Sequence, residues 1–343
     1  MRYDRALHAG FESLLASGGV LRPLVEYCRT PWRNYDLVPD LQLREKNKVG
    51  IYLGLTRVLE LQMESKGNIK PTASDAYRMD KHGVGREYGP GSYDRLAVDI
   101  LRYLEEVEVR PTFLTGEGRC QNWLSSRYGV RRKASHGELL SIDREVVIGY
   151  DNTDEKQRRW GEAIRKPALA LAKTISESDP RLYGERLHER PLGNEFDLLA
   201  WEPPDTFLCV EAKRGQYTHG IYMAPLQVAA YAVAWRDSDW DRLADGVRRL
   251  VEQKRDLGLI SMSDSECEMF EKSLEAPRFL PAIVIQNPNR RGLAWKRLAE
   301  VLTYIENGWP EGWGNNVLGS LRIYSVDEQN DSLLDITQEC LTW

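Results

Sequence analysis

Two carboxylates and one amine lie at close spacing in the second half of the chain. Within residues 193–215, Asp197 is followed by Glu211, and Lys213 comes two residues after Glu211. Side chains alternate along a strand, so Glu211 and Lys213 point to one side, and Asp197 can lie opposite them on a neighbouring strand. Burying such charges costs several kcal/mol per ion, so they need one another or a bound cation.

Oxygen atoms of this kind suit a hard divalent cation. The carboxylates of Asp197 and Glu211, together with a backbone carbonyl, are ligands suited to Mg²⁺ or Mn²⁺. Such a cation lowers the pKa of a bound water and stabilises negative charge on a phosphoryl oxygen. Lys213, partly desolvated beside the cation, would orient or activate the attacking water.

Two other interpretations of these residues stay open. Glu195 lies two residues before Asp197 on the same strand face and would be a ligand instead of Asp197 or beside it. Alternatively, Glu211 and Lys213 belong to a cross-strand ion pair at the edge of a sheet, which contributes little to stability.

The elements that must position these residues form a mixed α/β layer arrangement. Short connections predict antiparallel pairing of the first three expected strands, 181–189, 195–201 and 206–213, and later strands are expected at 279–285 and, at the sheet edge, 317–326. Helices are expected at 158–175 with a kink at Pro167, at 224–235, after Ser238, and at 291–307.

In this context the segment resembles the PD-(D/E)xK nuclease superfamily. An Asp on one strand and Glu-x-Lys on the next match Asp197, Glu211 and Lys213, and Gln227 and Tyr231 on the following helix resemble the Q-x-x-x-Y element of its RecB-like branch. Gln and Tyr four residues apart share one helix face, so both can address the same site.

The resemblance implies a restriction-endonuclease-like αβββαβ core and a role for each matching residue. Asp197 and Glu211 would hold the metal with the Ala212 carbonyl, and Lys213 would be the catalytic lysine. Gln227 and Tyr231 would position the site or contact the nucleic-acid backbone. The superfamily tends to place a Glu on the helix before the first core strand, for which Glu162 is the candidate.

The resemblance covers residues 158–290 and has one clear departure. Phe196 stands before Asp197, where the motif has Pro. Basic pairs near the core offer further contacts to phosphates, at Arg158 and Arg159, Arg165 and Lys166, Arg290 and Arg291, and Lys296 and Arg297. For these pairs a solvated helix face is an equally good interpretation.

Residues 1–150 resemble no family and are expected to form an accessory domain, with the nuclease domain at 151–343. Alternation of apolar residues over 40–62 predicts a β-hairpin or meander, residues 68–91 are expected as a loop, and Ser92 begins a predicted helix. The basic run Arg131-Arg132-Lys133 is read as a solvated face or a phosphate contact.

Composition and charge limit the kinds of protein that this sequence can encode. The 343 residues carry a net charge of −5, but residues 1–150 hold 23 Lys and Arg against 20 Asp and Glu, which leaves 24 against 32 for the rest. No apolar run is long enough to span a membrane, no secretory signal is evident, and the five cysteines form no C-x-x-C pair. We therefore expect a cytoplasmic protein without a membrane partner.

The predicted function is Mg²⁺-dependent hydrolysis of phosphodiester bonds, with DNA as the expected partner and RNA as the alternative. A prokaryotic defence, restriction or repair context is expected, with a homodimer or a partner protein of a multi-component system. The rival prediction is a nucleic-acid-binding or scaffolding protein that keeps the fold but does not cut. Part of the negative charge comes from acidic residues of the expected cation site. A bound cation changes the sign of the local electrostatic field, so the negative net charge does not exclude a nucleic-acid partner.

Overall fold

The chain forms two compact units in a computed structural model. The structure describes residues 1–33, 35, 37–78, 82–134, 138–178, 192–215, 218–289, 291–308, 318–327 and 330–341. The N-terminal unit comprises Asp4–Ile142 and Ala244–Glu268, and the C-terminal unit comprises Met1–Tyr3, Asp143–Leu243 and Met269–Trp343. The assignment of an accessory domain to 1–150 and a nuclease domain to 151–343 stays a prediction.

A four-stranded antiparallel sheet forms the centre of the N-terminal unit. Its strands follow chain order: β1 (Asp40–Arg44), β2 (Lys48–Leu53), β3 (Thr56–Met63) and β4 (Ile69–Thr72). Leu43 pairs with Val49, and both are fully buried, as the alternation of apolar residues predicts. The expected meander is confirmed, and it extends by β4 into residues predicted as a loop.

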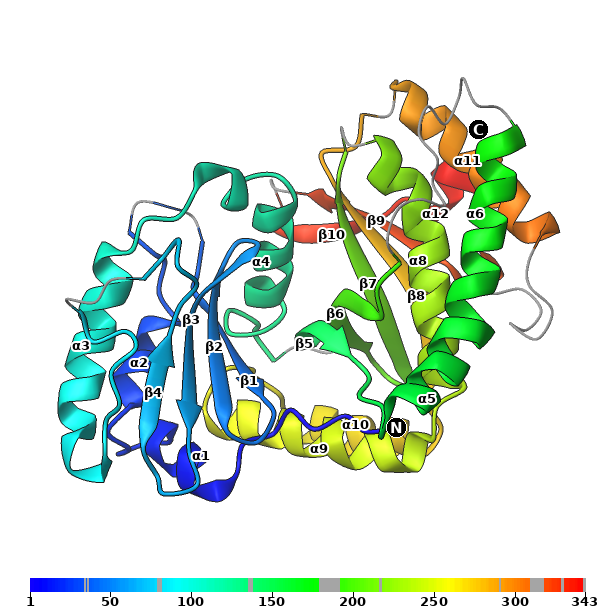
Figure 1. The fold of residues 1–343 in the computed structure, drawn as a ribbon. Coiled ribbons are helices and arrows are strands. Elements are labelled where there is room, and N and C mark those ends of the chain that lie inside the picture. Colours follow the sequence, from blue (N-terminus) through cyan, green and yellow to red (C-terminus); the bar gives the residue numbers. More distant parts are fainter. Residues whose placement is uncertain are drawn as a thin grey trace. The chain divides into compact units, whose positions relative to one another are not determined.

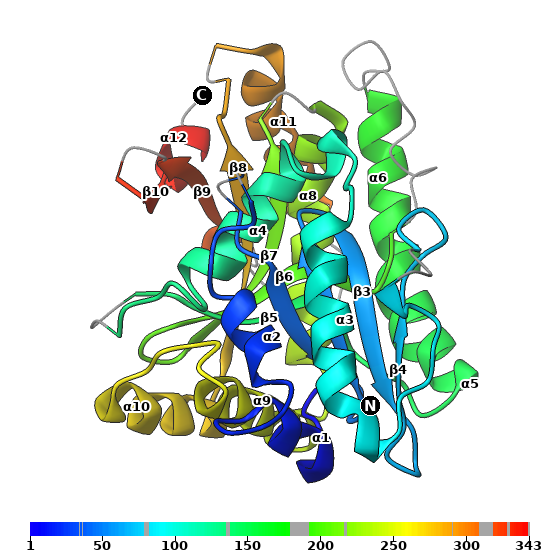
Figure 2. The same ribbon diagram turned by 90° about the vertical axis from the view of Figure 1, so that its left-hand side faces the viewer.

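Short helices surround this sheet: α1 (Ala9–Leu15), α2 (Arg22–Tyr27), α3 (Tyr93–Glu106) and α4 (Glu117–Arg127), with single 3₁₀ turns at Pro90–Ser92 and Pro111–Phe113. The predicted helix after Ser92 is confirmed as α3, which lies along the face of the sheet (Figure 2). The buried Tyr103 hydroxyl fixes this packing by donating to the carbonyls of Val58 and Tyr77, at 2.7 and 3.0 Å.

A buried ion pair crosses the same unit. Arg132 and Glu266 are both fully buried and bind each other through their side chains. Arg132 also donates to the carbonyls of Leu139 and Glu138, and Glu266 accepts the Ser263 N–H at 2.8 Å. Arg132 is therefore an internal structural residue, and the interpretation of its basic run as a solvated face or phosphate contact is wrong at this position.

The C-terminal unit contains a mixed sheet with strand order β10-β9-β8-β7-β6-β5. Its strands are β5 (Leu140–Val147), β6 (Glu195–Glu202), β7 (Thr206–Arg214), β8 (Arg278–Gln286), β9 (Arg322–Asp327) and β10 (Ser332–Asp335). β7 and β8 pair in parallel, as do β8 and β9, while β6 pairs antiparallel with β7. β9 was expected at the edge, but the short acidic β10 covers it. The expected strand 181–189 lies outside the described residues.

Helices cover this sheet in layers. They are α5 (Thr153–Lys156), a π-helix η4 (Gln157–Arg165), α6 (Lys166–Ser178), α8 (Thr218–Arg236), α11 (Leu293–Asn307), a 3₁₀ turn (Leu318–Ser320) and α12 (Thr337–Leu341). Two further helices follow α8, α9 (Trp240–Asp256) and α10 (Asp264–Glu275), and most of α9 and the start of α10 belong to the N-terminal unit. α8 packs on β7 and β8, and η4 and α6 pack against α8 (Figure 1). The mixed α/β class is confirmed; α10 was not predicted.

The predicted kink at Pro167 corresponds to a change of helix type. The nine residues of η4 have π-helical hydrogen bonding, and α6 begins at Lys166, so Pro167 lies in the first turn of α6. Proline is tolerated there because a first-turn N–H has no partner inside its own helix. No helix within the described ranges is both long and apolar enough to cross a membrane.

Candidate active site

The β6–β7 hairpin builds the candidate site. The two strands pair from Glu202 with Thr206 up to Leu198 with Val210. Asp197 is the next residue along β6, so the same register places it opposite Glu211 on β7. Most residues of both strands are apolar and buried. β8 lies beside β7 in the sheet, and α8 packs on the face of β7. Polar residues occur at both ends of the hairpin, and those at the open end include Asp197, Glu211 and Lys213.

The Asp197 side chain binds the backbone of the neighbouring strand. Its Oδ2 accepts the Ala212 N–H at 2.7 Å. The carboxylate thus lies beside the segment of β7 that carries Glu211 and Lys213, and the hydrogen bond restricts its rotation. Charged hydrogen bonds to backbone N–H groups are stronger than neutral ones, so this contact fixes the distance between β6 and β7 here.

Glu211 and Lys213 form a buried pair within β7. The Lys213 Nζ donates to Glu211 Oε1 at 2.7 Å, and only 8% and 7% of the two side chains are exposed. The pair joins residues of one strand, and β7 lies between β6 and β8, so the interpretation as a cross-strand pair at a sheet edge is wrong. Both charges are desolvated, and the hydrogen bond between them offsets part of that cost.

Tyr231 lies between two aromatic rings next to these carboxylates. Its ring stacks on Phe196 at 5.3 Å and on Trp160 at 6.0 Å, with 3% of the residue exposed. Burial, followed by the negative charges of Glu211, Asp197 and Glu195, raises the pKa of the Tyr231 phenol above its ordinary value. The phenol therefore stays protonated and keeps a hydrogen to donate.

Phe196 has a packing role beside the site. It stacks on Tyr231 and is 2% exposed. Sequence reasoning did not identify Trp160 or Phe196 as part of the site. The only sequence signal for Trp160 is its place on the apolar stripe of its helix, and that stripe does not name a partner.

Gln227 lies one turn before Tyr231 on α8 and is half-buried. The two predicted helix residues therefore share one face, the face on which Tyr231 approaches the carboxylates. The structure thus gathers Asp197, Ala212, Glu211, Lys213 and Tyr231, with Gln227 on the adjoining turn.

The remaining predicted residues lie elsewhere or outside the described part of the chain. Glu162 is exposed on η4, and its oxygens accept from Gln157 and Lys166 at 2.8 Å each. The hydrogen bond from Lys166, followed by that from Gln157, lowers the pKa of Glu162. Arg291 is exposed in the turn before α11, and Arg290 lies outside the described residues, as does the strand 181–189.

The donor set fits a magnesium ion. Among the residues that the structure describes, no three His, Cys, Asp or Glu side chains gather closely enough to hold a metal by themselves. Magnesium keeps several of its waters and binds proteins through one or two carboxylates. Asp197, Glu211 and the Ala212 carbonyl meet this requirement.

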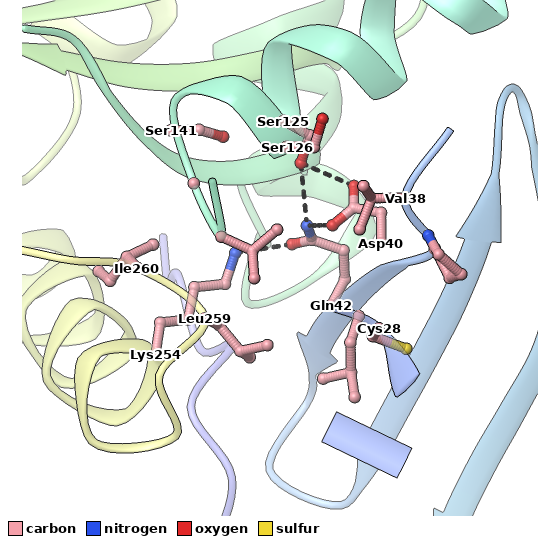
Figure 3. A pocket seen from close by; sticks show the side chains of 14 residues that line it. Cys28, Val38, Asp40, Gln42, Ser125, Ser126, Ser141, Lys254, Leu259 and Ile260 are labelled. Carbon is pink, nitrogen blue, oxygen red and sulfur yellow. Dashed lines mark hydrogen bonds between the residues drawn. The ribbon is translucent and has the colours of Figure 1, made fainter. Parts of the chain in front are cut away.

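A second polar cluster is buried in the N-terminal unit (Figure 3). Lys254 Nζ donates to Gln42 Oε1 at 2.8 Å, Gln42 donates to Asp40, and Ser125 Oγ donates to Asp40 at 2.7 Å. The cavity that these side chains line holds about 20 Å³, which is room for one water molecule. The cluster therefore has a structural role in binding β1 to α4 and α9.

No protein-family model, no curated protein and no solved structure matches the chain.

Proposed function

We propose that the protein is a metal-dependent nuclease of the PD-(D/E)xK type, with a restriction-endonuclease-like core, and that it hydrolyses phosphodiester bonds in DNA. One observation carries the proposal. A lysine and a glutamate form a buried pair at 2.7 Å on a central strand, and an aspartate on the adjacent strand binds the residue between them. A purely structural ion pair does not need a third charge, and here the partly buried carboxylate of Asp197 lies beside the buried pair.

In the proposed mechanism, Asp197, Glu211 and the Ala212 carbonyl would hold a magnesium ion, which would supply Lewis-acid stabilisation of charge on the phosphoryl oxygen and lower the pKa of a bound water. The Asp197–Ala212 hydrogen bond keeps one ligand in place before the substrate arrives, which reduces the reorganisation needed in the reaction.

Lys213 acts on the water that attacks phosphorus. The oxygen of this water forms a bond to phosphorus and its proton passes to solvent, the bond from phosphorus to the leaving oxygen breaks, and the leaving oxygen takes up a proton from solvent. Lys213 Nζ, held at Glu211, orients the water by hydrogen bonding. Tyr231 stays protonated, and its hydroxyl would donate a hydrogen bond to a phosphate oxygen or to a carboxylate of the site.

The wider setting is part of the same proposal. The five cysteines are all free thiols, and four of them are buried, which suits a reducing compartment such as the cytoplasm. We propose action on DNA in a prokaryotic defence, restriction or repair system, with the N-terminal unit choosing the target, forming a homodimer or docking a partner protein.

The test is cleavage of end-labelled DNA and RNA of the same sequence by the purified chain, with Mg²⁺ and with EDTA. We expect Mg²⁺-dependent cleavage of DNA, and a loss of about 100-fold or more in Lys213→Met at a temperature where this variant is folded, since removing one preorganised hydrogen-bond donor costs about 10² to 10³ in rate. Lys166→Met, which removes an exposed amine paired to Glu162, is the matched control and should cleave normally. Binding of nucleic acid without cleavage by the wild type would establish the scaffolding alternative. Faster cleavage of RNA than of DNA would assign RNA as the substrate.

A further inference from the structure

A strongly basic surface follows the helices that pack behind Tyr231. Residues 156–173 of η4 and α6 contain one carboxylate, Glu162, while the whole chain has a net charge of −5. The same segment carries six cationic residues: Lys156, Arg158, Arg159, Arg165, Lys166 and Lys173. The charge of this segment is therefore opposite to that of the protein as a whole.

The cations all lie outside the buried stripe of these helices. The stripe consists of residues that are at most 6% exposed, namely Trp160, Ile164, Ala168, Leu171, Ala172 and Ile175. Lys156, Arg158, Arg165, Lys166 and Lys173 are exposed, and Arg159 is partly exposed. Packing of the stripe against α8 thus turns the cations to solvent.

Three of these cations, Lys156, Arg158 and Arg165, form no ion pair with another residue that the structure describes. Arg159 lies 3.3 Å from Glu155, Lys166 lies 2.8 Å from Glu162, and Lys173 lies 3.8 Å from Glu177. A guanidinium without an internal partner keeps its whole set of donors for an external anion.

The helix that carries the basic surface also contacts the candidate site, through its opposite, buried face. Trp160, which lies between Arg158 and Arg165 in η4, stacks on Tyr231 at 6.0 Å with the ring planes 10° apart. The surface from Arg158 to Lys173 extends over roughly 20 Å at the rise of a helix, which matches about six phosphates along one strand. An extended polyanion matches a surface of this length and charge.

We propose that the exposed face of η4 and α6 binds the sugar–phosphate backbone of a nucleic-acid strand, with Arg158 and Arg165 as its principal contacts. This inference rests on the proposed nuclease function for its substrate class, but it concerns binding and does not require cleavage. Contacts to phosphates do not read sequence, so the surface would hold DNA without selecting a target.

The experiment measures binding of fluorescein-labelled duplex DNA in EDTA by anisotropy over a range of salt concentrations. The slope of log K against log salt is negative for a protein that binds phosphates. For Arg158→Gln/Arg165→Gln we expect this slope to become less negative by about 1.8, since each phosphate contact contributes about −0.9. At about 0.1 M salt this corresponds to roughly 60-fold weaker binding. Lys272→Gln/Arg278→Gln removes two exposed cations from α10 and β8 of the same unit and should leave the slope unchanged.

Single-stranded DNA and RNA of the same sequence are measured in the same way, and the double variant should bind both more weakly than the wild type does. Equal slopes for the double variant and its control would overturn the inference, and so would a wild type that binds none of the three ligands. If binding depends on Arg158 and Arg165 but no form of the protein cleaves, the surface assignment stands and the proposed nuclease function fails.

Discussion

Asp197 and Ala212 are joined by a hydrogen bond of 2.7 Å from the Ala212 N–H to the Asp197 carboxylate. This contact continues the pairing of β6 and β7 by a side chain, one residue beyond the last backbone pair. It brings the Asp197 charge next to the buried Lys213–Glu211 pair. Three charged residues therefore meet where the hairpin opens, and the proposed chemistry depends on this arrangement.

The Lys213–Glu211 pair predicts a strongly non-additive effect of mutation on stability. Lys213→Met leaves Glu211 buried without its cation, so we expect the free energy of unfolding in urea to fall by about 3–5 kcal/mol. The double variant Glu211→Gln/Lys213→Met removes both charges and should recover part of this loss. Lys166→Met at the exposed pair should change stability little. If the double variant were as unstable as the sum of its single variants, the two residues would not depend on each other.

Tyr231 predicts a loss of stability at alkaline pH. Its pKa is raised in the folded state, whereas in the unfolded chain a tyrosine ionises near pH ~10. The contribution of Tyr231 is therefore complete below pH ~10 and is lost as the pH rises above that value. Unfolding midpoints should fall less steeply between about pH 9 and 11 for Tyr231→Phe than for the wild type. Tyr304→Phe, at an exposed position, is the control. Parallel curves for wild type and Tyr231→Phe would contradict this account of the phenol.

The Arg132–Glu266 pair predicts acid sensitivity of the N-terminal unit. Burial alone acts to raise the pKa of Glu266, but the hydrogen bonds from Arg132 and Ser263 outweigh it and lower the pKa. The stabilisation is thus present above the ordinary Glu pKa and is lost as the pH falls through the folded-state pKa. Arg132→Met should cost about 3–5 kcal/mol near neutral pH. Glu266→Gln should flatten the acid side of the stability profile, measured by thermal unfolding; an unchanged acid slope would show that other carboxylates control it.

The hairpin was predictable because its signals are local. Apolar residues on both sides of the Pro203–Asp205 turn indicate two paired strands, and alternation then places Asp197 opposite Glu211. The meander in the N-terminal unit was predictable for the same reason. Period and turn chemistry are properties of neighbouring residues, and they are readable without knowing the tertiary packing.

The contacts between distant segments were not predictable. Trp160, Phe196 and Tyr231 come from η4, β6 and α8, and no periodicity says which aromatic residues stack on which. Arg132 belongs to a run of basic residues that reads as exposed, yet its partner Glu266 lies more than a hundred residues later. The charge of a segment therefore does not determine its burial, because long-range pairing can satisfy an internal ion.

The rate of Mg²⁺-dependent cleavage of end-labelled DNA by Asp197→Asn, compared with Asp205→Asn, tests the central claim most directly. Asparagine can still accept the Ala212 N–H, so the fold is kept while the ligand charge is lost. Asp205 is 44% exposed in the turn of the same hairpin, which makes it a matched control. Loss of several kcal/mol of metal-based stabilisation predicts a rate lower by about 100-fold or more for Asp197→Asn, with Asp205→Asn at the wild-type rate. Equal rates for a folded Asp197→Asn and for the wild type would contradict the assignment of this site.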